Sequence, residues 1–142
     1  MAQSASSTLC YNLAARSYSR GLTRLYDRHL AGEAITSSQF SILAVIARRP
    51  AISVADLATT MVMERTTLMR ALHPLEDSGL IVRDFQGRRK IELSLTPVGE
   101  AKLERVKPLW AEAQTAVEAA SGEGEAGALR DLMLKHIYDH SQ

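Results

Sequence analysis

Apolar residues recur every three or four positions along most of the chain, a spacing that predicts helices. The first four predicted helices cover about residues 9–31, 36–49, 53–60 and 64–78. In the last of these, Leu68, Leu72 and Leu75 form one apolar stripe. Because the stripe continues past Pro74, we predict one helix there with a bend at the proline.

The apolar pattern changes after Gly79, a residue type that commonly ends helices. Residues 80–82 are an apolar run, and residues 91–95 alternate between apolar and polar, as in a half-buried strand. The connecting residues 84–89 contain Gly87 and several charges, so they predict a hairpin loop. The predicted fold is therefore mainly α with one small β-hairpin.

A short helix, a tight turn at Met61-Val62 and a longer helix make the pattern of a helix-turn-helix. The longer helix has a polar face with the short side chains and donors that reading a major groove requires. That face consists of Arg65, Thr66, Thr67, Arg70 and His73. The hairpin that follows carries Arg88 and Arg89 at its tip, which is typical of a wing that reaches a minor groove or the phosphate backbone.

The two ends of the chain carry further predicted helices. Thr96-Pro97 opens one of them with a cap and a proline at the first helical position. Its apolar residues have a 3-4-3-4 spacing, which favours packing against another helix, such as one from a partner chain. They are Leu103, Val106, Trp110, Ala113 and Val117. We expect one domain over residues 1–142, in which dimerisation helices at about 9–31 and 97–140 flank a winged helix-turn-helix lobe at about 36–95.

Composition adds the broad class and the compartment. The 142 residues, 46% of them hydrophobic and 23% charged, are typical of one globular domain. A net charge of only +1 argues mildly against nucleic acid, but residues 83–90 hold four cations and one anion, a local charge of +3. One cysteine, no visible signal peptide and no apolar run near the roughly 20 residues of a membrane span predict a cytoplasmic protein.

No constellation of residues indicates an enzyme. The acidic residues show no paired catalytic spacing, and no glycine-rich phosphate loop follows a strand. His136 and His140 are four residues apart, but two histidines alone rarely form a metal site, so we interpret them as structural. We expect no enzymatic activity, no metal and no cofactor.

Five stretches resemble the multiple-antibiotic-resistance regulator (MarR) family of bacterial transcription factors, and the resemblance runs from about Leu13 to Ile137. The stretches are residues 36–43, 57–58, 66–70, 75–81 and 93–99. The resemblance implies a homodimer with interlocking end helices, bound to pseudo-palindromic double-stranded DNA and released by a small molecule or an oxidant.

Two positions depart from the family pattern. Gly87 stands where the family's wing has an Asp that orients the wing arginine, which is Arg89 here, and Asp84 is the candidate replacement. Glu64 stands where a Ser or Asp often caps the recognition helix, and glutamate is a poorer cap.

The sequence offers two candidate sites for the signal that releases the protein from DNA. Tyr11, Arg16 and Phe40 are candidate lining residues for a small aromatic or anionic effector. Cys10 resembles the peroxidatic cysteine of the organic-hydroperoxide regulators within the family, although the Tyr that those regulators place four residues later is Ala14 here.

The predicted function is a sequence-specific, double-stranded-DNA-binding transcription regulator, in the usual family mode a repressor released by a small molecule. One alternative is a redox-sensing regulator that uses Cys10. Another is a winged-helix protein-interaction module without a DNA site, since fold alone does not decide between the two. The arginines on both the helix and the wing favour DNA.

Overall fold

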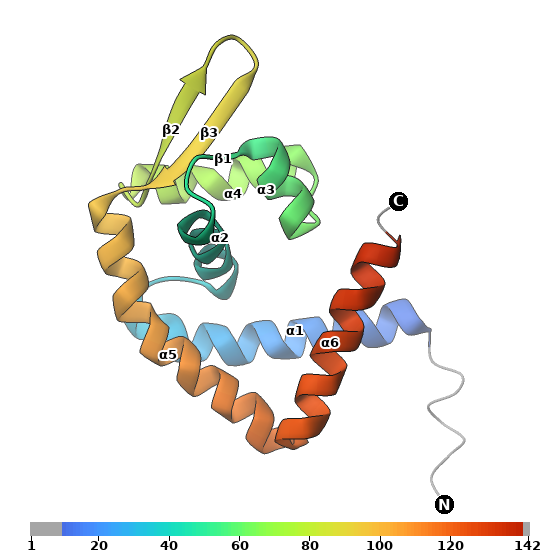
Figure 1. Ribbon diagram of the computed structural model, residues 1–142. Coiled ribbons are helices and arrows are strands. Elements are labelled where there is room, and N and C mark those ends of the chain that lie inside the picture. The colour runs from blue at the N-terminus through green and yellow to red at the C-terminus, as the bar shows by residue number, and fades with distance from the viewer. Residues whose placement is uncertain (1–9, 141–142) are drawn as a thin grey trace, which may run out of the picture. The chain divides into compact units, whose positions relative to one another are not determined.

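The computed structural model describes residues 10–140, and the side chains of all of these except 123 and 138–140. Its helices and hairpin follow the predicted order, so a mainly α fold with a small β-hairpin is confirmed (Figure 1). The chain divides into two compact units. We call residues 30–108 the winged unit, and the other described residues, 10–29 and 109–140, the helical unit.

The winged unit is built around one apolar core. Its elements are the 3-10 helix η1 (Ala31–Glu33), α2 (Ser37–Arg48), β1 (Ile52–Ser53), α3 (Val54–Met61), α4 (Arg65–Asp77), β2 (Ile81–Gln86), β3 (Lys90–Leu95) and the first half of α5 (Pro97–Ser121). Leu68, Leu72 and Leu75 of α4 are almost completely buried, as the leucine stripe predicts. Full burial of each such side chain contributes about 1.5–3 kcal/mol. The burial of this stripe leaves the opposite face of α4 to solvent.

Side-chain caps begin α2 and α3. The Thr36 hydroxyl accepts a hydrogen bond from the Gln39 N–H at 3.2 Å, and the Gln39 amide oxygen accepts one from the Thr36 N–H at 3.0 Å. The Ser53 hydroxyl accepts from the Asp56 N–H at 3.0 Å. Each cap typically contributes about 1 kcal/mol. Glu64, at the same position of α4, makes no side-chain cap.

The sheet is larger than the sequence predicts. It has three antiparallel strands in the order β1-β3-β2, and β1 pairs Ile52 with Leu93. β2 continues through Gln86, which pairs with Lys90, so only residues 87–89 form the turn. The prediction of a loop over residues 84–89 was therefore wrong, because backbone pairing in an exposed hairpin does not require apolar alternation. Figure 1 shows the β2–β3 hairpin projecting beyond the helices of this unit.

Left-handed backbone follows several helical segments of the winged unit. Gly79 ends α4 with φ 70°, as predicted, and Val62 follows α3 with φ 52°. This conformation is uncommon for a β-branched residue, so the turn between α3 and α4 is strained. After α1 (Tyr11–Leu30) the chain enters η1, and Ala34, not Gly32, takes the left-handed position with φ 51°.

The beginning of α5 lies tightly against the end of the helix-turn-helix. The Thr96 N–H donates to the Leu80 carbonyl at 3.0 Å, and the Thr96 hydroxyl donates to the Gly79 carbonyl. The same hydroxyl accepts from the Gly99 N–H at 3.0 Å. A methyl group added to Gly99 would lie 2.9 Å from the Leu80 carbonyl carbon and closer still to its oxygen. Only glycine fits this approach of two backbone segments.

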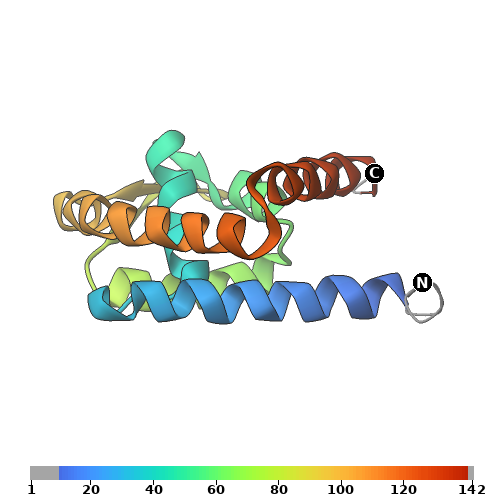
Figure 2. The same cartoon turned by 90° about the horizontal axis from the view of Figure 1, so that it is seen from below.

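The helical unit consists of α1, the second half of α5 and α6 (Glu123–His140). Gly122, with φ 85°, separates α5 from α6. Figure 2 shows α1 as one uninterrupted helix and α6 as a separate one. Large apolar side chains are exposed on α6, at Leu129, Leu132, Met133, Leu134 and Ile137.

The apolar seam of α5 is buried largely by its own chain. Leu103, Val106 and Ala113 are buried, and Trp110 and Val117 are half-buried. The expectation that a partner chain packs on this seam was therefore wrong for its most buried positions. A 3-4-3-4 spacing shows that one side of a helix is covered, but it does not say which chain supplies the cover.

Among the described residues, no single helix is long and apolar enough to cross a membrane. Only residues 11–33 and 37–48, taken together as one bent pair, reach that length and apolar content.

Candidate nucleic-acid interface

The polar face predicted for α4 is exposed. Helical periodicity places Thr66, Arg70 and His73 on the side opposite the buried leucines, with Arg65 and Thr67 on its two flanks. All five side chains are exposed. The first turn of α4 therefore offers a guanidinium group and two short hydroxyl side chains to any groove that the helix enters.

The hairpin tip lies beside the beginning of α4. Gly87 has φ 70°, which favours glycine, and Arg88 and Arg89 complete the turn with exposed side chains. An open hollow of about 470 Å³ separates the two elements. It is lined by Arg65, Phe85, Gly87, Arg88, Arg89, Lys90 and Ile91. The structure thus brings together one predicted site residue of the helix and both of the wing.

Ion pairs neutralise some of the cations counted in the sequence. Arg83 pairs with Glu76 of α4, and Lys90 pairs with Glu92 of its own strand at 2.9 Å. Arg65, Arg70, Arg88 and Arg89 form no ion pair with any carboxylate that the structure describes. The local charge of +3 over residues 83–90 therefore overstates the charge that this segment offers, whereas α4 adds two free cations to the interface.

The wing arginine is not oriented by Asp84. That carboxylate accepts a hydrogen bond from the side-chain amide of Gln86 at 2.8 Å. Asp84 faces Glu92 across the strands, so the pair of carboxylates lies on the hairpin and not at its tip. The expectation that Asp84 replaces the missing family Asp was therefore wrong in this structure.

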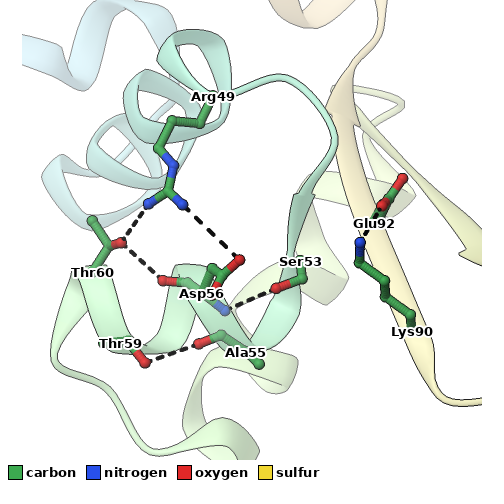
Figure 3. A network of polar contacts seen from close by, with 8 residues as sticks. All are labelled: Arg49, Ser53, Ala55, Asp56, Thr59, Thr60, Lys90 and Glu92. Atoms are coloured by element: carbon green, nitrogen blue, oxygen red, sulfur yellow. Dashed lines mark hydrogen bonds and ion pairs between the residues drawn. The ribbon is translucent and has the colours of Figure 1, made fainter.

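A polar network connects Arg49, the residue after α2, with α3 (Figure 3). Arg49 Nη1 donates to the Thr60 hydroxyl at 3.2 Å, and Arg49 Nη2 lies 4.0 Å from the Asp56 carboxylate.

Beside this network, the hydrogen bond and the charge of Glu92 raise the pKa of Lys90 above its ordinary value. Exposed pairs of this kind contribute little to stability. Lys90 stays fully charged at neutral pH.

The remaining predicted site residues lie in different parts of the fold. Tyr11 and Arg16 are exposed on α1 in the helical unit, and Phe40 is buried on α2 in the winged unit. Cys10 is exposed directly before α1, and its carbonyl accepts from the Ala14 N–H at 3.0 Å. Among the side chains that the structure describes, which leave out Glu123, Asp139 and His140, no group of three or more His, Cys, Asp or Glu residues could hold a metal ion.

A small cavity of about 120 Å³ lies within the helical unit, between α1, α5 and α6. Its lining includes Tyr18, Tyr26, Gln114 and Glu118. The Tyr26 hydroxyl donates to the Gln114 side-chain oxygen. Burial, followed by the nearby Glu118 carboxylate, raises the pKa of Tyr26 above its ordinary value. Sequence reasoning did not select this cavity, because its residues come from three helices with no common motif.

Two curated relatives cover most of this chain. A putative transcriptional regulatory protein for the hcr operon of Thauera aromatica is 33% identical over 108 residues, 75% of this chain and 64% of the relative. The chain thus spans slightly less than two thirds of that relative. The homoprotocatechuate degradative operon repressor of Escherichia coli is 30% identical over 130 residues, 89% of this chain and 78% of the repressor.

Two solved structures share the fold. The M. tuberculosis transcriptional regulator MosR in complex with DNA has a TM-score of 0.83 and 31% identity, covering 92% of this chain and 96% of that one. NadR in complex with 4-hydroxyphenylacetate has a TM-score of 0.73 and 26% identity, covering 91% of this chain and 93% of that one. A family model described as the MarR family matches residues 35–84. On these grounds, this chain belongs to the MarR family of transcription regulators.

Proposed function

We propose that this chain is a sequence-specific, double-stranded-DNA-binding transcription regulator that acts as a repressor. α4 enters the major groove, and the β2–β3 hairpin is the wing. One observation carries the proposal: Arg65 of the helix and Arg88 and Arg89 of the wing border the same open hollow without a carboxylate partner among the described residues. Free cations on two adjacent elements complement the phosphates of a duplex. The MosR neighbour was solved with DNA.

The two elements have different roles in this proposal. Thr66, Arg70 and His73 lie on the side of α4 opposite the core, where side chains can reach base edges, with Arg65 and Thr67 flanking them. Arg88 and Arg89 contact phosphates or a minor groove, and such contacts position the protein more than they specify a sequence. An experiment should therefore separate affinity from base preference.

Removing the wing charge should reduce salt dependence. Arg89→Ala should weaken binding to all duplex sequences by a similar factor, because it removes a phosphate contact. The slope of log affinity against log salt should fall by about one for each wing. Titration of labelled duplex DNA at several salt concentrations measures both quantities. Lys107→Ala removes a charge from an exposed ion pair on α5 and should leave the slope unchanged. An unchanged slope in Arg89→Ala would mean that the wing does not touch DNA.

We also propose a homodimer, in which helices at about 9–31 and 97–140 pair two chains around lobes at about 36–95. The support is the row of exposed apolar side chains on α6, since contiguous patches of this kind mark interaction surfaces. Two equal recognition helices would fit a pseudo-palindromic site with half-site centres about 10 bp apart. A reducing, cytoplasmic location suits such a regulator.

A charge on α6 should break this dimer. Leu132 is 54% exposed, and Leu132→Glu would place an unpaired carboxylate in the proposed interface, which is strongly unfavourable. We expect a monomer by light scattering and a large loss of DNA affinity. Asp131→Lys, which helical periodicity puts on the far side of α6 from Met133, is the matched control and should remain dimeric. A dimeric Leu132→Glu would show that α6 does not form the interface.

We propose further that a small aromatic or anionic molecule releases the DNA. NadR was solved with 4-hydroxyphenylacetate, which is both aromatic and anionic. The DNA titration repeated with 4-hydroxyphenylacetate as a probe tests this class of effector, and release of the duplex supports it. Unchanged DNA affinity at saturating concentrations would argue against an effector of this kind.

A further inference from the structure

A two-contact ion pair connects the wing with the recognition helix. Arg83, on β2, donates through Nη2 to Glu76 Oε2 at 2.6 Å and through Nε to Glu76 Oε1, and Glu76 lies on α4. Only 15% of the Arg83 side chain and 23% of the Glu76 side chain are exposed. Paired contacts between a planar guanidinium and a carboxylate define an orientation as well as a distance.

The same guanidinium contacts a second residue of α4. Arg83 Nη1 lies 3.9 Å from the sulfur of Met69, and Met69 and Glu76 are seven residues apart on the same side of the helix. Arg65, four residues before Met69, continues this side to the hollow beside the wing. Arg83 therefore spans two turns of the flank of α4 that faces the hairpin.

Other polar contacts of the hairpin do not connect it with α4. Gln86 bonds to Asp84 within β2, and Lys90 pairs with Glu92 within β3. Among residues 10–140, no other side-chain hydrogen bond or ion pair joins either strand of the hairpin to α4. The Glu76–Arg83 pair is thus the polar connection between the two proposed DNA-binding elements.

The Glu76–Arg83 pair is far enough from the tip of the hairpin that a small rotation at the pair would displace the tip appreciably. Arg83 is the third residue of β2 and faces the fully buried Leu93, so it stands at the root of the hairpin. The turn that carries Arg88 and Arg89 begins four residues further on, because Gln86 already pairs with Lys90, so the tip is about 13 Å away at the usual rise of a strand. A rotation of the root by about 20°, comparable with the ordinary twist between strands, would move the tip by about 5 Å. Such a shift exceeds the length of a hydrogen bond.

We propose that Glu76 and Arg83 are positioning residues for DNA recognition: their ion pair sets the angle of the wing to α4, so that Arg89 and the recognition helix engage one duplex together. The proposal rests on the proposed function. It requires that the contribution of Arg89 to binding depend on Glu76, although the two side chains do not touch. Coupling without contact is the property that a merely stabilising ion pair would lack.

A double-mutant cycle with the whole 142-residue chain tests this dependence. The measured quantity is the factor by which Arg89→Ala weakens binding to duplex DNA, in the wild-type, Glu76→Gln and Asp77→Asn backgrounds. Asp77→Asn is the matched control, because it removes the same charge from the next residue of α4, which is exposed. Thermal unfolding of each variant shows whether it is folded at the temperature of the titration.

We expect the Arg89→Ala factor to shrink by about threefold or more in Glu76→Gln, in line with typical coupling energies, and to stay at its wild-type value in Asp77→Asn. Equal factors in all three backgrounds would overturn the positioning role while leaving DNA binding intact. A wild-type protein on which Arg89→Ala has no effect would instead overturn the wing contact itself, and the positioning role with it.

Arg83→Lys provides a second route if Glu76→Gln does not fold. Lysine keeps the charge but lacks the planar fork that makes two parallel contacts. The Arg89→Ala factor should fall in this background as well, at unchanged net charge. A full wild-type factor in a folded Arg83→Lys would show that charge alone suffices and that the fork geometry does not orient the wing.

Discussion

Alanine in place of Gly99 should destabilise the protein by about 3 kcal/mol or more, at the upper end of what overpacking costs. The added methyl group would press on the Leu80 carbonyl, and backbone cannot rotate away as a side chain can. The displaced Leu80 carbonyl also accepts the hydrogen bond of the Thr96 N–H, so that contact would weaken too. For a chain of this size the midpoint of thermal unfolding should fall by about 10 °C.

Calorimetry or circular dichroism on heating measures this effect. Gly32→Ala is the matched control, because nothing lies within 4 Å of a methyl group there and the residue belongs to the same unit. The control should unfold within a few degrees of the wild type. A Gly99→Ala variant that unfolds at the wild-type temperature would mean that the end of α4 and the start of α5 separate easily.

The second large effect should come from Arg70. Its guanidinium lies on the side of α4 opposite the core and has no ion pair among the described residues, so Arg70→Ala should leave folding unchanged. A lost two-contact arginine–base pair is typically worth about 1–3 kcal/mol of discrimination, which is roughly fivefold to 150-fold at each half-site. A dimer bound to two half-sites would lose this discrimination between bases at both of them.

Selection from random duplex DNA with the wild type and with Arg70→Ala tests this role. The variant should lose preference at one base position of each half-site and keep it elsewhere. Arg89→Ala is the contrasting variant, since it should weaken binding while leaving every base preference in place. Identical base preferences in Arg70→Ala and the wild type would mean that a different side of α4 faces the bases.

The sequence was informative wherever a local pattern decides the structure. The leucine stripe of α4 and the left-handed Gly79 both depend on residues close together in the chain, and both were predicted correctly. β1 was missed because two residues, Ile52 and Ser53, cannot show a period. They become a strand only because β3 passes beside them.

Contacts between different helices and strands could not be predicted from local patterns in the sequence. The separation of Glu76 and Arg83 by seven residues resembles helical spacing, yet the pair forms because β2 turns back along α4. Helical spacing does place Met69 and Glu76 on the same flank of α4. The sequence does not show, however, that β2 runs along this flank and brings Arg83 to both residues. Gly99 likewise fits a helix start, and its close approach to Leu80 depends on where α5 begins. The roles of the individual site residues in DNA binding stay predictions.

β2 is one of the two outer strands of the sheet, and this has a consequence for the protein in the absence of DNA. An outer strand presents unpaired backbone groups to other molecules, and the exposed Val82 and Phe85 make it a favourable template for pairing between chains. Asp84 places a negative charge between Val82 and Phe85 in the strand. The free arginines of the turn repel a second hairpin of the same charge. The charges proposed to attract the duplex should therefore also keep unbound molecules from associating through their wings.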